Sequence, residues 1–262
     1  MAERDNTRSP EREGALGVTR KAATLAAQDT TAEDLALINQ FALTELTADQ
    51  VFTFKAVLCD NKLDRQFERF TIKALQELQA LFLGKTVIKD HEHSADNQVA
   101  RIYKTELRTS ATELTTGAEP YTQLVAHCYM VRTASNADLI AEIQGGIKKE
   151  GSVGFRPSSA ICSICGTDNV KSYCRHWPGK NYDKEGGQEL CTFTLTGASD
   201  AYEFSLVAVP AQRAAGVSKS YTGETVYEAA EPETQPDEKE QARAHELELR
   251  ARLIKSKAKS NL

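Results

Sequence analysis

The segment Val51-Phe52-Thr53-Phe54-Lys55-Ala56-Val57-Leu58-Cys59 decides the fold class of this chain. Its β-branched and aromatic residues precede the turn pair Asp60-Asn61, a pattern typical of a buried strand. The next segment predicts a helix that is capped by Thr71 and ended by Gly84. One face of that helix is apolar and carries Ile72, Leu75, Leu78, Leu81 and Phe82.

Further strand and helix patterns follow in a regular order. We predict strands over 86–88, 98–107, 123–132, 151–155, 192–199 and 202–209, and a helix over 137–149. About seven strands with two helices in this order indicate an α+β domain. We expect a compact, mostly antiparallel β-barrel or sheet with surrounding helices.

Composition divides the 262 residues into three parts. Residues 1–48 and 221–262 are rich in charge, Ala, Thr and Gln, which favours a helical or disordered arm and a partly helical charged tail. Residues 49–220 carry nearly all the aromatic residues and should form the core. The net charge of −5 argues against nucleic acid, and no apolar run is long enough for a membrane span, so we expect a cytosolic, soluble protein.

A cysteine cluster predicts a metal site within an insertion over 160–192. The candidate ligands are Cys162, Cys165, Cys174 and Cys191, with His176 as an alternative. Their spacing fits a zinc knuckle, and four protein ligands would leave no open position for catalysis, so the Zn²⁺ would be structural. The alternative is two disulfides. The apparently unpaired Cys59 and Cys128, with no secretory signal, favour a reducing compartment instead.

Two histidines follow the predicted strand over 86–88, in Asp90-His91-Glu92-His93. A His-x-His pair places both imidazoles on one face of a strand and occurs in catalytic metal sites. A third ligand would then come from Asp90, Glu92 or Asp96. The other interpretation is a polar surface turn, which suits His93 more than His91.

A serine and a buried carboxylate complete a second candidate set. Ser152 lies in Gly151-Ser152-Val153-Gly154-Phe155, where glycines would allow substrate to approach the backbone. Glu203 lies in an otherwise apolar strand, where an ionisable side chain needs a partner, and a histidine would suit it. The chain order is histidine, serine, acid. A serine nucleophile needs such a base and such an orienting group.

These motifs also carry a resemblance to a known family. Gly84-Lys85-Thr86-Val87 with Asp90-His91, then 98–102, then Lys149-Glu150-Gly151-Ser152-Val153-Gly154-Phe155, then 202–211 resemble the tailed-bacteriophage prohead (capsid maturation) serine proteases. The similarity covers roughly residues 50–218, and the cysteine insertion resembles a subgroup of that family. The resemblance implies a herpesvirus-assemblin-like fold, a β-barrel surrounded by helices.

The resemblance also implies an activity and its residues. The protein would cleave scaffold and major capsid proteins, and then itself, inside the immature head in the host cytoplasm. The nucleophile carries over to Ser152, the base to His91 and the acid to Glu203. His93 is the alternative base, and His91 is favoured because the Asp-His pair directly follows the predicted strand. Two rival functions stay open: a non-catalytic head-assembly or scaffold protein, and a zinc hydrolase that uses His91 and His93.

Overall fold

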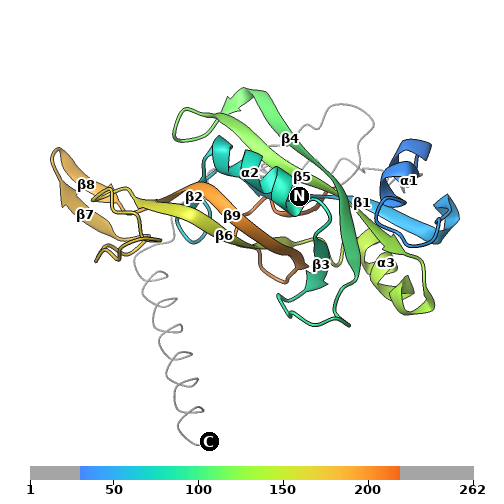
Figure 1. The fold of residues 1–262 in the computed structure, drawn as a ribbon. Coiled ribbons are helices and arrows are strands. Elements are labelled where there is room, and N and C mark those ends of the chain that lie inside the picture. Colours follow the sequence, from blue (N-terminus) through green and yellow to red (C-terminus); the bar gives the residue numbers. More distant parts are fainter. Residues whose placement is uncertain (1–29, 219–262) are drawn as a thin grey trace, which may run out of the picture. The chain divides into compact units, whose positions relative to one another are not determined.

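The computed structural model describes residues 30–218, which form a mostly antiparallel sheet with few helices (Figure 1). The strands of the main sheet are β1 (Val51–Asp60), β2 (Glu68–Phe70), β3 (Thr86–Lys89), β4 (Ala100–Leu114), β5 (Pro120–Val131), β6 (Gly151–Cys162), β9 (Phe193–Leu206) and β10 (Gly216–Ser218). A separate hairpin consists of β7 (Asn181–Lys184) and β8 (Gly187–Leu190). The α+β class is as predicted.

The strand order in the main sheet is β10-β1-β5-β4-β3-β9-β2, and β6 pairs with β9. The sheet is mixed, because β2 and β3 run parallel to β9 while the other pairs are antiparallel. The expectation of a closed barrel is wrong for the described residues. Only an isolated bridge between Glu150 and Gly216 joins the start of β6 to β10, because the described part of β10 is three residues long.

The helices are α1 (Ala32–Ile38), α2 (Ile72–Phe82) and α3 (Ala137–Gln144), with short 3₁₀ turns at Ala48–Gln50 and Ala134–Asn136. Thr71 caps α2 as predicted, because its Oγ1 accepts the Ala74 N–H at 3.2 Å. The buried face of α2 packs against β9, β4 and β5 to form the main core (Figure 1). In this part of the chain, no helix is long and apolar enough to cross a membrane.

Four predicted boundaries of helices and strands are wrong. The helix expected over 137–149 ends at Gln144, because Gly145 caps it and Gly146 adopts a φ of 73°. The strands expected over 192–199 and 202–209 are one strand, β9, because β6 pairs along its whole length. Both β4 and β6 extend well past their predicted ends. The helix expected in the C-terminal tail lies outside the described residues.

Candidate functional site

His91 lies in a tight turn directly after β3. Asp90 and His91 both have positive φ angles, 52° and 53°, which are uncommon for residues with a Cβ. The turn is tied by the buried Asn97, whose Nδ2 donates to the carbonyls of Lys89 (2.7 Å) and Glu92 (2.9 Å). This backbone strain is held by neighbouring contacts and directs His91 toward the sheet.

The parallel pairing of β3 with β9 brings His91 to the predicted acid. The register runs from Thr86 opposite Glu203 to Lys89 opposite Leu206. The His91 N–H donates to Ser205 Oγ at 2.8 Å, and His91 Nδ1 lies 2.8 Å from Glu203 Oε1. Of the two candidate histidines, His91 therefore contacts the acid, whereas His93 is exposed in the same turn.

Glu203 is the buried member of this pair, with a side chain that is 1% exposed, compared with 42% for His91. Its second oxygen, Oε2, is buried without a hydrogen-bond partner among residues 30–218. A buried carboxylate with an unpaired oxygen is costly. Formation of a positive charge on the adjacent imidazole would offset part of that cost.

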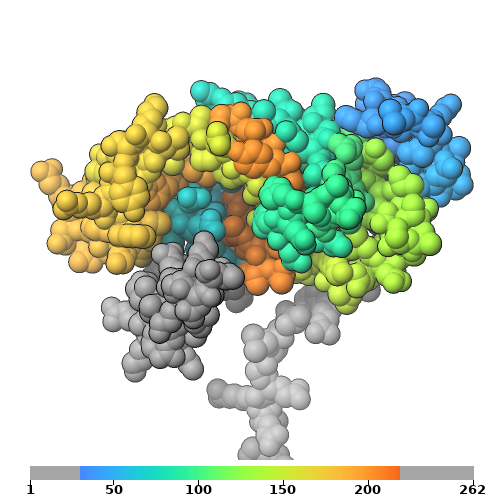
Figure 2. Space-filling model, turned by 60° about the horizontal axis from the view of Figure 1, so that its bottom comes forward, coloured from blue at the N-terminus to red at the C-terminus, as the bar shows by residue number. Residues whose placement is uncertain are grey.

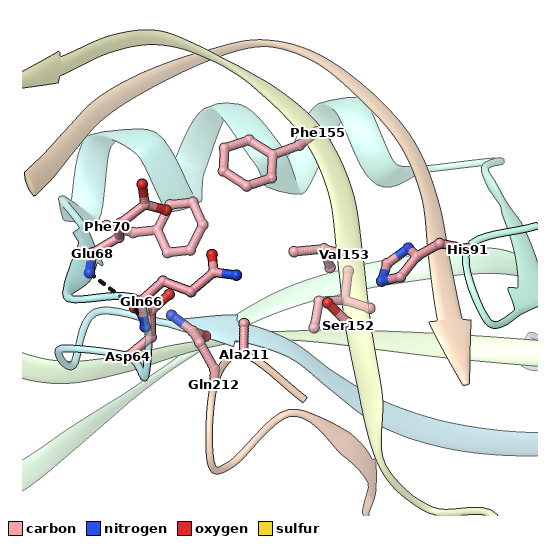
Figure 3. A pocket seen from close by; sticks show the side chains of 11 residues that line it. Asp64, Gln66, Glu68, Phe70, His91, Ser152, Val153, Phe155, Ala211 and Gln212 are labelled. Atoms are coloured by element: carbon pink, nitrogen blue, oxygen red, sulfur yellow. Dashed lines mark hydrogen bonds between the residues drawn. The ribbon is translucent and has the colours of Figure 1, made fainter. Parts of the chain in front are cut away.

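Ser152 reaches the same place from β6, where it pairs with Ser205 of β9. Ser152 and His91 line one end of a pocket of about 230 Å³ (Figure 3). The space-filling view shows one face of the molecule hollowed between the yellow cysteine region and the green chain near β3 (Figure 2). Among the described residues there is no hydrogen bond between the side chains of Ser152 and His91. In ligand-free enzymes such bonds are often long and tighten when substrate binds.

Gly151 and Gly154, on either side of Ser152 and Val153, lie close against side chains of the neighbouring strand β9. A Cβ on Gly154 would overlap Glu203 Oε1, and a Cβ on Gly151 would overlap the ring of Phe204. The glycines therefore leave space for side chains of β9, and Gly154 in particular makes room for the carboxylate that contacts His91.

A Cys/His cluster lies in the insertion. One ligand atom from each of Cys162, Cys165, Cys174 and His176 lies within 4.8 Å of the others, a set that could hold a metal ion. The 3.8 Å between Cys162 Sγ and His176 Nδ1 fits the edge of a tetrahedron with metal bonds of about 2.0–2.3 Å. Three thiols and an imidazole are a donor set typical of structural zinc.

Cys191 lies beside this cluster but outside the group of four. Its Sγ is 3.9 Å from Cys162 Sγ, so it remains within reach of the same centre. Burial raises the pKa of Cys191 to about 12, whereas the Thr167 hydroxyl and N–H lower the pKa of Cys165 to about 6. The cluster thus combines His176, the predicted alternative, with three of the four predicted cysteines.

The surrounding loop orders these ligands. Asn169 Oδ1 accepts the Cys174 N–H at 3.1 Å. The ring of Tyr182, on the β7–β8 hairpin, contacts the His176 ring edge-on at 4.7 Å. The Tyr182 hydroxyl accepts the Trp177 N–H at 2.9 Å. The hairpin therefore acts as a support for the histidine ligand.

The sequence did not point to several residues of the site. Ser205 and Asn97 hold the His91 backbone, and Asp64, Gln66 and Glu68 line the far end of the pocket. Ser205 lies two residues after Glu203 on β9, so both side chains lie on the same face of the strand, and this spacing could have identified Ser205 from the sequence. The loop at 64–68 gave no such signal, because it reaches the pocket only through tertiary packing.

Comparison with known proteins adds no relative: no family model, curated protein or solved structure matches this chain.

Proposed function

We propose that this protein is a serine endopeptidase with Ser152 as nucleophile, His91 as general base and Glu203 as orienting acid. The observation that carries this proposal is the 2.8 Å contact between His91 Nδ1 and the buried Glu203 carboxylate, beside a pocket that Ser152 also lines. A histidine that is oriented by a buried acid and lies next to a serine is the arrangement that acyl transfer requires.

The mechanism follows from the tautomer of His91. With Glu203 ionised, Nδ1 carries the proton and donates to Oε1, which leaves Nε2 free to accept a proton. His91 takes the Ser152 hydroxyl proton as Oγ attacks the peptide carbonyl, and then gives that proton to the leaving amine. In the second half, His91 takes a proton from water as the water oxygen attacks the acyl carbonyl, and it returns that proton to Ser152 Oγ as the bond between Oγ and the acyl carbon breaks. Glu203 stabilises each imidazolium that forms.

An oxyanion donor is expected on the free edge of β6. The Gly151 N–H points away from β9, because it donates to the Ala215 carbonyl at 3.3 Å. Residues two apart in a strand share their direction, so the Val153 N–H should also point away from β9. Val153 lines the pocket and directly follows Ser152, which makes its amide our candidate for stabilising the developing oxyanion.

The substrate assignment rests on the resemblance of the sequence motifs. We propose that the protein matures phage proheads by cleaving scaffold and major capsid proteins and itself, within immature heads in the host cytoplasm. Self-association in the prohead is part of this proposal. The metal is proposed to be a structural Zn²⁺ held by Cys162, Cys165, Cys174 and His176, which would fasten the insertion without taking part in the reaction.

The zinc-hydrolase alternative has less support. Within residues 30–218, the group of side chains close enough together to hold a metal ion consists of Cys162, Cys165, Cys174 and His176. Neither His91 nor His93 belongs to it. His91 Nδ1 is already engaged by Glu203. Activity that a chelator abolishes without unfolding would favour this alternative.

The non-catalytic scaffold alternative is separated from the protease by co-expression with coat and scaffold proteins. Cleaved partners support the protease, and co-assembly without cleavage supports the scaffold.

Mass spectrometry of the wild type and Ser152→Ala then assigns the nucleophile. We expect self-cleavage and labelling by a fluorophosphonate probe in the wild type, and neither in Ser152→Ala. Ser158→Ala, an exposed serine on the same strand, is the matched control and should behave as the wild type. Unchanged cleavage by Ser152→Ala would overturn the assignment.

A further inference from the structure

The pocket beside Ser152 has two chemically different ends. Ser152 and His91 lie at one end, and Asp64, Gln66 and Glu68 gather at the other (Figure 3). With a volume of about 230 Å³, the pocket can hold a substrate side chain whose backbone lies against Ser152 and whose tip reaches the acidic end.

The acidic end is built by a tight turn between β1 and β2. Asp64 Oδ1 accepts the backbone N–H groups of Gln66 and Glu68, each at 2.8 Å. Arg65 ties this turn to the segment after β9, because its Nη1 donates to the Pro210 carbonyl at 2.9 Å. The turn is thus held in place against the pocket before any ligand binds.

The two carboxylates lack a basic partner within the described chain. No salt bridge among residues 30–218 joins Asp64 or Glu68 to a lysine, arginine or histidine. Burial raises the pKa of both side chains, and for Glu68 the neighbouring Asp64 carboxylate adds to the effect. A cation placed between them would relieve this repulsion and replace part of the lost hydration.

One wall of the pocket between the two ends is apolar (Figure 3). The rings of Phe70 and Phe155 lie 5.1 Å apart, and Val153 continues the same lining toward Ser152. A side chain with a long aliphatic stem and a charged tip matches this sequence of surfaces, because the stem packs on apolar groups while the tip reaches a carboxylate.

We propose that this pocket binds a lysine or arginine side chain of the substrate, at the residue next to the scissile bond. Glu68 is the main specificity-determining residue, because Asp64 Oδ1 is already occupied by two backbone N–H groups. This inference rests on the proposed endopeptidase function, since it names the substrate class of the same site.

Binding to the full-length Ser152→Ala variant tests the pocket without requiring catalysis. The probes are fluorescein-labelled peptides Ala-Ala-X-Ala-Ala, with X as lysine, arginine, norleucine, glutamine or glutamate, and the readout is fluorescence anisotropy. We expect the lysine and arginine peptides to bind about tenfold more tightly than the norleucine peptide, as for one charge-assisted contact. Adding Glu68→Gln should remove most of this preference. Adding Glu142→Gln, a carboxylate outside the pocket, should preserve it.

Equal binding of lysine and norleucine peptides would overturn the inference, as would a preference for glutamate or no binding of any peptide at about 1 mM. A basic preference that survives both Glu68→Gln and Asp64→Asn would overturn it as well. Fluorophosphonate labelling of the wild type reports on Ser152 separately. Labelling without a basic preference therefore rejects the pocket assignment alone, and a basic preference without labelling rejects the endopeptidase alone.

Discussion

Substitution of Glu203 by glutamine separates a catalytic acid from a structural one. The change keeps the size of the side chain and removes its negative charge. In the wild type, Oε1 contacts His91 Nδ1 at 2.8 Å while Oε2 is buried without a partner in the described chain. The variant therefore weakens the hydrogen bond to His91 and at the same time removes the buried negative charge whose Oε2 lacks a partner.

The expected effect on stability is small. Loss of the charge-assisted bond to His91 costs about 1 kcal/mol relative to a neutral one. Removal of a buried, half-paired charge recovers about 1–3 kcal/mol, and the unpaired amide that replaces it costs a similar amount. The net change in the free energy of unfolding should therefore be within about 2 kcal/mol.

The expected effect on activity is large. An amide N–H facing His91 would hold the proton on Nε2, so the imidazole could not accept the Ser152 proton. The comparable acid-to-amide change in serine proteases lowers kcat about 10⁴-fold, which is about 5.4 kcal/mol in the activation free energy. Activity and stability should therefore respond very differently to Glu203→Gln.

The assay pairs the rate of fluorophosphonate labelling and scaffold cleavage with urea unfolding of the same preparation. Glu106→Gln is the matched control, because Glu106 Oε1 lies 3.4 Å from His127 Nε2 in a second Glu–His pair that does not line the pocket. It should leave activity unchanged. The reasoning fails if Glu203→Gln retains activity within about tenfold while folded, or if it loses about 3–5 kcal/mol of stability, as when a structural buried pair is broken.

Three further predictions follow from individual contacts. Gly154→Ala should lower the free energy of unfolding by about 1–3 kcal/mol and lower activity, because the added Cβ overlaps Glu203 Oε1. Gly146→Ala is the control: the space around its Cβ is open, so it should lose stability only through the positive φ of residue 146 and keep full activity. Equal activity in the two variants, measured beside their unfolding curves, would contradict this prediction. His176→Ala should lose bound metal and Cys191→Ser should keep it, as measured by metal analysis of the purified proteins, and the reverse result would make Cys191 the fourth ligand. Burial raises the pKa of Glu68 in the folded state above the ordinary value of 4.5, so the free energy of unfolding should fall as pH rises from 4.5 to the raised pKa. Glu68→Gln should therefore be more stable than the wild type at neutral pH, and its free energy of unfolding should fall less over this range. Urea unfolding at several pH values measures both, and a variant that is less stable than the wild type at neutral pH would refute the sign.

The sequence by itself determined the fold class, several of the strands and helices, and the chemistry available at the site. Strand patterns such as 51–59 and the capped helix after Thr71 are local signals, because alternation, apolar periodicity and capping act between residues that are close in the chain. A carboxylate within apolar β9 already required a partner, and a Cys-x-x-Cys spacing already indicated a metal site.

Only the tertiary structure decided how these pieces meet. The parallel register of β3 against β9 selects His91 over His93 as the contact of Glu203, and the fold of the insertion groups His176 with three cysteines while Cys191 stays beside them. Within residues 30–218, only an isolated bridge joins β10 to the start of β6, so the sheet does not close into a barrel. The turn at 64–68 supplies the acidic end of the pocket. These outcomes depend on pairing between segments far apart in the chain, where a shift of one residue reverses the face on which a side chain lies.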